Sequence, residues 1–409
     1  MHAVAALLLA MLPTKGMAAG GQVYETRTMS GQLRTLRMTT DLLTLGSDET
    51  IEVSFDELSH NVHLYSYTVY HLNNDRTRDD LNSGEYLSGF PRADITDYEH
   101  SFNTQQLYTH YRFEFPNDDM RPTLSGNYAI VIYEDGREET PVATACFYIV
   151  EPSVAIETTV RSNTNIELNG RYQQLDVDVS LGSTQYHSPD EFTLVVEQNG
   201  RHDNSVYKPR PTYVESSHLR WRDCRALIFE GGQEYQHFDI SSLYILGNNV
   251  DYQHFDQTFH HAFLFPSVVR ADDPYLTELD ANGSFVVHAE RVSDSDTEAD
   301  YMFVHFILPA SQPWFDGSIY LLGDAWHNLF TEDNRMRYDN EHKAYVLSSY
   351  LKQGGYEWLY AFVPKGSRAA TLQRVEGSHW QTGNTYRIYL YHRPFGSRYD
   401  KLIGVSEKQ

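Results

Sequence analysis

The sequence has little of what most enzymes and metal sites are built from. It contains only two cysteines, Cys146 and Cys224, and none of the motifs GxSxG, HExxH, CxxC, GxxxxGK[ST] or GxGxxG. Their absence removes the usual signals of a serine hydrolase, a zinc protease, a thiol pair, a phosphate-binding loop and a dinucleotide fold. Neither cysteine has the flanking residues of a known nucleophile, and two separate buried thiols are favoured over a disulfide bridge. We therefore predict no catalytic residue, no metal and no cofactor.

Positive charge is also scarce. The chain has 32 Lys and Arg against 56 Asp and Glu, a formal net charge of −24. A phosphate backbone is bound by clustered cations, and so is an anionic lipid surface. The sequence therefore predicts no nucleic-acid partner and no docking on an anionic membrane.

Long hydrophobic runs are missing after the first residues. Residues 3–12 form an apolar core that is too short to span a bilayer, and small residues follow at Ala18 and Ala19. Residues 1–19 are typical of a secretory signal peptide, and no later segment is apolar enough for a membrane helix. We expect an exported protein that is periplasmic and associated with the outer membrane.

Aromatic residues are abundant: 30 Tyr, 20 Phe and 5 Trp in 409 residues. Such residues favour strands, and Asx-Gly turn signals recur along the chain. The sequence therefore predicts an all-β protein of tandem immunoglobulin-like β-sandwich domains. Pro152 and the acidic run at 293–300 suggest the boundaries, and we read that run as a solvated linker. The expected division is 1–19 signal peptide, 20–152 N-terminal domain, 153–292 middle domain and 293–409 C-terminal domain.

One stretch, FEFPNDDMRPTLSGNYAIVIYEDG at residues 113–136, tests whether this chain carries an active site. Apolar residues occupy both faces of the strand that begins near Tyr128, so we expect a central strand. It should form a hairpin with a strand at about Val142 to Val150. The polar cluster before it is expected to be a loop whose side chains bond nearby backbone, rather than a metal site.

The histidines do not suggest a metal centre either. His260 and His261 are adjacent, so on a strand they would point to opposite faces. A zinc site needs ligands that converge on one point. Exposed or interface histidines are the favoured interpretation.

The segment from Gly317 to Pro364 resembles early-set immunoglobulin-like modules of the starch- and glycogen-binding type. The resemblance is carried by Tyr320, Gly323, Trp326, Met336, Tyr338, Leu347, Gly355, Tyr356 and Tyr360. Two interpretations of Trp326 remain open: an exposed ring that stacks on a sugar, or a ring that caps the sandwich core, as large aromatics usually do.

The chain as a whole resembles the periplasmic plug protein family of the type IX secretion system in Bacteroidota. Six stretches carry the resemblance: FEFPNDDMRPTLSGNYAIVIYEDG, PVATACFYIVEP, LIFEGGQEYQHFDI, PYLTELDANGSFVV, GSIYLLGDAWHNL and EGSHWQTGNTYRIYLYHRPFGSRYDKLIGV. It implies a non-enzymatic protein that closes or gates the outer-membrane translocon barrel when no cargo occupies it. Tyr and Trp suit such an interface, because they bury area and keep a polar group.

Loop residues of these stretches are the candidate partner-binding positions. For Arg393, Arg398 and Tyr399, packing inside the protein is an equally open interpretation. The alternatives to a plug are a glycan-binding outer-membrane accessory protein that uses the early-set-like C-terminal module, a secreted hydrolase and a scaffold protein. The candidate positions are Asn117, Asp118, Asp119, Arg121, Trp326, Arg393, Arg398 and Tyr399.

Overall fold

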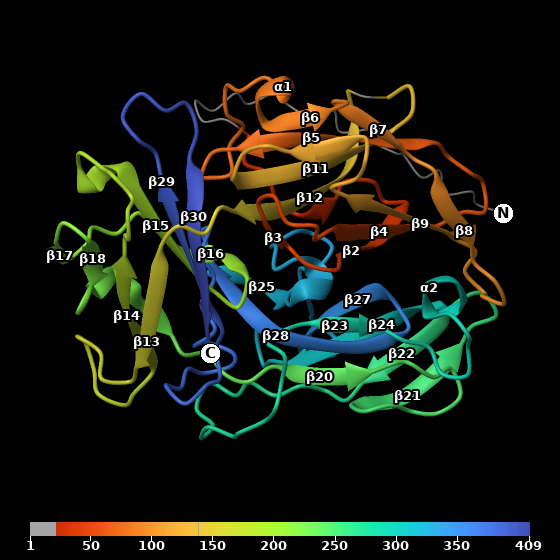
Figure 1. The fold of residues 1–409 in the computed structure, drawn as a ribbon. Coiled ribbons are helices and arrows are strands. Elements are labelled where there is room, and N and C mark those ends of the chain that lie inside the picture. Colours follow the sequence, from red (N-terminus) through yellow and green to blue (C-terminus); the bar gives the residue numbers. More distant parts are fainter. Residues whose placement is uncertain (1–21, 138) are drawn as a thin grey trace.

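The computed structural model describes residues 22–137 and 139–409, and almost all of the regular secondary structure within them is β-strand. Figure 1 shows three bodies of paired sheets, one at the upper right, one at the left and one at the lower right. The all-β sandwich fold predicted from the sequence is confirmed. The signal peptide expected at 1–19 lies outside the described residues. The helical segments are α1 (Ser83–Tyr86), α2 (Ser295–Glu298) and the 3₁₀ turns Pro189–Glu191, Arg225–Leu227 and Asp324–Trp326.

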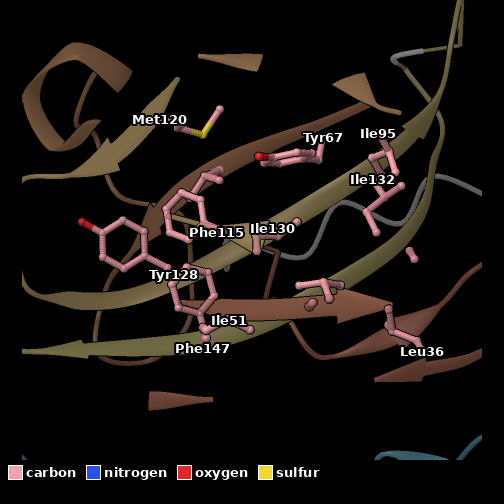
Figure 2. Close-up of a cluster of buried hydrophobic side chains, with 14 of the residues drawn as sticks. Leu36, Ile51, Tyr67, Ile95, Phe115, Met120, Tyr128, Ile130, Ile132 and Phe147 are labelled. Carbon is pink, nitrogen blue, oxygen red and sulfur yellow. The ribbon is translucent and has the colours of Figure 1, made fainter. Parts of the chain in front are cut away.

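The first sandwich encloses a core in which Tyr128 and Phe147 of one sheet meet residues such as Ile51 of the other (Figure 2). Its larger sheet has the path β1-β12-β11-β5-β7, with β3 beside β12, and its second sheet has the order β2-β4-β9-β8; β6 and β10 pair separately. The strands are β1 (Arg27–Thr28), β2 (Leu33–Met38), β3 (Leu42–Thr44), β4 (Ile51–Glu57), β5 (Tyr65–Leu72), β6 (Leu87–Gly89), β7 (Arg92–Ile95), β8 (Asp97–His100), β9 (Thr109–Phe115), β10 (Met120–Pro122), β11 (Gly126–Glu134) and β12 (Pro141–Val150).

Strand β11 is central, as its two apolar faces predict. It pairs with β12 on one side and β5 on the other. Tyr128, Ile130 and Ile132 enter the sandwich core, while Ala129 and Val131 enter a second cluster on the other face of the sheet. The hairpin of β11 and β12 is confirmed.

The second sandwich combines residues that are far apart in the chain. Strands β29 and β30, the last two of the protein, complete a sheet of order β16-β15-β29-β30. The facing sheet has β14 in contact with β13, β18 and β19, and β17 pairs with β18. The strands are β13 (Ala155–Arg161), β14 (Tyr172–Ser180), β15 (Phe192–Gln198), β16 (Arg201–Tyr207), β17 (Tyr213–Val214), β18 (His218–Trp221), β19 (Ile228–Glu230), β29 (Tyr386–His392) and β30 (Lys401–Lys408).

The third sandwich is inserted between β19 and β29. In one sheet, β28 pairs with β20, β23 and β25; the other has the order β21-β22-β24-β27-β26. Trp358 and Phe306 lie in the core between them. The strands are β20 (Gln236–Asp239), β21 (Val250–Phe255), β22 (His260–Leu264), β23 (Phe285–Val287), β24 (Tyr301–Pro309), β25 (Gly317–Leu322), β26 (Arg337–Asp339), β27 (Ala344–Lys352) and β28 (Gly354–Pro364).

The strand pairing does not follow the division expected at residues 292 and 293. Strands β20 to β23 precede that point, yet they pair within the third sandwich, and β29 and β30 return to the second. The acidic run at 293–300 is also not the solvated linker expected, because Asp294 caps α2 and Asp300 is buried. Turn residues indicate where a strand ends, but not which distant strand it will join.

Candidate interaction surfaces

Asn117 organises the loop that follows β9. Its side-chain oxygen accepts hydrogen bonds from the backbone N–H groups of Asp119 (3.1 Å) and Met120 (3.0 Å), and its amide donates to the Tyr67 hydroxyl (2.7 Å). The structure thus gives Asn117 the backbone-bonding role that the sequence suggested for the neighbouring carboxylates. Asp118 and Arg121 form an exposed ion pair at 3.2 Å.

The turn between β29 and β30 holds three of the candidate residues. Arg393 donates to the Arg398 carbonyl (2.7 Å), and Arg398 pairs with the Glu85 carboxylate (2.7 Å). Tyr399 packs against the first core and lies edge-on to the His71 ring, with 5.6 Å between centroids. All three side chains therefore make contacts within the protein, as the packing interpretation expects.

The loop at residues 117–121 and the β29–β30 turn both contact the short segment formed by α1 and β6. Strand β10, which includes Arg121, pairs with β6, and β6 follows α1 directly, where Glu85 meets Arg398. The backbone N–H of Asn82 and the Arg398 guanidinium together hold the pKa of Glu85 below its usual value. The sequence separation between these groups gives no hint of this proximity.

Trp326 lies apart from both groups, in the third sandwich. Its ring is half-buried, packs against the core and meets Phe306 edge-on at 6.0 Å between centroids. Its indole N–H donates to the Ser349 hydroxyl (3.2 Å). These contacts favour the packing interpretation, because they occupy part of the ring that a sugar would need.

A polar cleft of about 880 Å³ separates the first and second sandwiches beside the β29–β30 turn. Its walls carry both signs of charge, including Asp75 and Arg78 from the first sandwich and Asp190 and Lys208 from the second. Such a lining suits a polar protein segment better than a strongly charged polymer.

A buried ionic cluster joins the first and third sandwiches. Asp56 on β4 accepts from Lys352 Nζ, the Tyr301 hydroxyl and His110 Nδ1, each at 2.6 Å. Burial would raise the pKa of Asp56, but Lys352 and the hydrogen bond to His110 outweigh it and hold that pKa below its usual value. Burial lowers the pKa of Lys352. The cluster fixes how the two sandwiches meet.

The described ranges hold no cluster of metal-ligating side chains and no disulfide. Across residues 22–137 and 139–409, no group of three or more His, Cys, Asp and Glu side chains could hold a metal ion. Both cysteines are free, as expected, and burial raises the pKa of the Cys146 thiol to about 12. A thiol with that pKa is a poor nucleophile.

Sequence reasoning missed the buried Asp56–Lys352 pair and the exposed Phe395. A lysine at a core-facing position of a strand is a usable signal for a buried partner, and YLKQGGYEW places Lys352 in such a run. Phe395 stands between proline and glycine in RPFGSR, where an aromatic residue at a turn indicates exposure.

The fold and these surfaces define an all-β protein of several sandwiches. Its distinctive features are the buried contacts between sandwiches and the exposed loops. In family comparisons, residues 26–151 match the model described as "Type 9 secretion system plug protein 1st domain". By this match the first sandwich, residues 26–151, belongs to the type IX secretion system plug protein family.

Comparison with known proteins adds a structural relative of similar extent. A crystal structure of a hypothetical protein from Parabacteroides merdae ATCC 43184 is 35% identical in sequence and superimposes with a TM-score of 0.92. The match covers 95% of this chain and 99% of that chain. No curated protein matches. No helix among the described residues has the length and apolar character that a membrane crossing requires.

Proposed function

We propose that this protein is a non-enzymatic periplasmic plug that closes or gates the outer-membrane type IX translocon when no cargo occupies it. The observation that carries the proposal is the match of residues 26–151 to the plug family. The junctions between sandwiches support it, because an element that fills a wide opening must resist deformation.

Two junctions supply that rigidity. Between the first and second sandwiches, Tyr148 packs on Tyr389 (4.6 Å between ring centroids) and the Tyr391 hydroxyl donates to Asn127 Oδ1 (2.7 Å). Between the first and third, the pair of Asp56 and Lys352 is fully buried. A body held in this way can enter and leave an opening as one piece.

Affinity purification of the tagged protein from its native envelope tests the proposal. The result expected is recovery of the large outer-membrane translocon subunit, identified by mass spectrometry, under conditions that keep that subunit intact. Its absence from the eluate, with the tagged protein folded and in the periplasm, would contradict the plug function.

A glycan-binding role remains the second proposal for the C-terminal module, but the structure offers it less support. Trp326 is engaged with Phe306 and Ser349 rather than standing free. Retention on immobilised glucan that Trp326→Ala abolishes, with folding intact, would favour it over a purely structural role.

A further inference from the structure

The turn at residues 393–399, here called the C-terminal finger, is clamped at its base. Arg398 donates to the Asp80 carbonyl (2.6 Å) and pairs with Glu85, and both partners belong to the first sandwich. Asp400, which is buried, accepts from the backbone N–H of Asn74 (3.0 Å). In Figure 1 the loop between β29 and β30 projects at the upper left, beyond the ends of its strands.

The tip of the finger is a tight turn that presents one aromatic ring. The N–H of Ser397 donates to the Pro394 carbonyl (2.9 Å). Gly396 has φ +84°, the value that the third residue of a type II turn requires and that other residues adopt at a cost. Phe395 occupies the second position and is 94% exposed.

A phenyl ring that stands in water on a closed turn with a clamped base has the properties of a binding anchor. The backbone that carries the ring is already ordered before a partner arrives, so binding would lose less backbone conformational entropy. Aromatic anchors that fill a pocket dominate many protein interfaces. The arginines beside it are engaged within the chain, so the ring is the group left for a partner.

We propose that the C-terminal finger anchors this protein on the translocon, with Phe395 entering an apolar pocket of the partner protein. The inference rests on the proposed plug function. The neighbouring cleft of about 880 Å³, lined by both signs of charge, accepts a polar loop of the same partner. A protein is favoured over a lipid surface because the net charge of −24 repels anionic leaflets and a single ring inserts little apolar area.

The test compares Phe395→Ala with Phe315→Ala in the full-length tagged protein. Phe315 is a matched control, since it is 85% exposed in a loop of the third sandwich. We expect translocon recovery from the native envelope to fall at least tenfold for Phe395→Ala and to stay at the wild-type level for Phe315→Ala. Urea unfolding curves check that both variants are folded.

Photo-crosslinking separates the finger from the plug function itself. With Phe395→p-benzoylphenylalanine, the translocon subunit should appear as a crosslinked product, whereas Phe315→p-benzoylphenylalanine should give none. Wild-type recovery together with undiminished recovery of Phe395→Ala overturns the finger and leaves the plug standing. Failure of the wild type overturns both. Binding to phosphatidylethanolamine–phosphatidylglycerol vesicles that needs Phe395 also overturns the proposal, in favour of a lipid surface.

Discussion

Lys352 shows how one buried charge can set the relation between two sandwiches. The side chain is fully buried, and its ammonium pairs with Asp56 while lying 4.2 Å from the Tyr108 ring centroid. Removing one partner of a buried pair leaves the other charge without compensation, which usually costs more than the pair contributes. Lys352 and Asp56, which come from different sandwiches, therefore each compensate the buried charge of the other.

Lys352→Met is expected to lower the free energy of unfolding by about 3–5 kcal/mol, because Asp56 would remain buried and charged. The double variant Asp56→Asn, Lys352→Met should lose less than the sum of the two single changes. Urea unfolding followed by tryptophan fluorescence measures both.

A matched control is available in the exposed pair of Asp118 and Arg121. Arg121→Ala should leave the unfolding midpoint unchanged, since exposed pairs contribute little. An equal loss for Arg121→Ala and Lys352→Met would contradict the special role of the buried pair.

His305 gives a prediction about pH. Burial and the neighbouring His261 lower its pKa to about 4. In contrast, the hydrogen bond to Asp339 raises the pKa of the exposed His342 above its ordinary value. Between about pH 4 and pH 6.5 the unfolded chain binds a proton at His305 that the folded protein does not, so stability from this group rises with pH across that window.

NMR titration of histidine side-chain resonances checks this assignment. His342 should titrate above 6.5 and His305 near 4, and His305→Ala identifies its resonance by loss. Titration of both residues at the same pH would show that His305 is not buried as described.

At the scale of elements, the sequence predicts local pairings well and distant ones poorly. The hairpin of β11 and β12 follows from two strand-forming apolar runs and the Asp135-Gly136 turn signal between them. The pairing of β15 with β29 has no such signal, because nearly two hundred residues and a whole sandwich separate them along the chain. Proximity across that distance depends on tertiary packing, which no local pattern encodes.

The positions of the candidate partner-binding residues in the fold follow only partly from the sequence. The recurrent stretches indicated Arg393 and Arg398, and both lie at the proposed finger. For Trp326 the sequence leaves both sugar stacking and core packing open, and in the structure its ring packs on Phe306. Whether a loop residue faces solvent or a neighbouring sandwich depends on how the sandwiches meet. For Phe395 the turn sequence RPFGSR is the one local signal of exposure that we identify.

Fragments of the chain test the strand pairing directly. Residues 293–409 alone should not fold cooperatively, because they lack β20, β22 and β23, the partners of β24 and β28, and carry β29 without β15. Residues 232–385 keep every strand of the third sandwich and should show a cooperative unfolding transition by circular dichroism. A cooperative transition for 293–409 would contradict the pairing.

At the scale of the whole molecule, the three sandwiches are linked to one another by strand order and by buried contacts. The second sandwich is closed by the two last strands, the third is inserted within it, and the first is tied to both by buried contacts. Such interlocking opposes the separation of single domains, so we expect release from an opening to move the protein as a unit. A chain of independently folded modules would not need buried junctions of this kind.

Outer-membrane permeability tests most directly the proposed function, in which this protein closes a wide opening. A barrel with a wide, unfilled lumen conducts large solutes. Deleting the gene in the native cell should let a fluorescent dextran too large for porins enter the periplasm, and the wild-type protein supplied in trans should restore exclusion. Deleting the translocon as well should abolish the leak. Dextran exclusion that is unchanged in the single deletion, with the translocon still present in the membrane, would contradict the account.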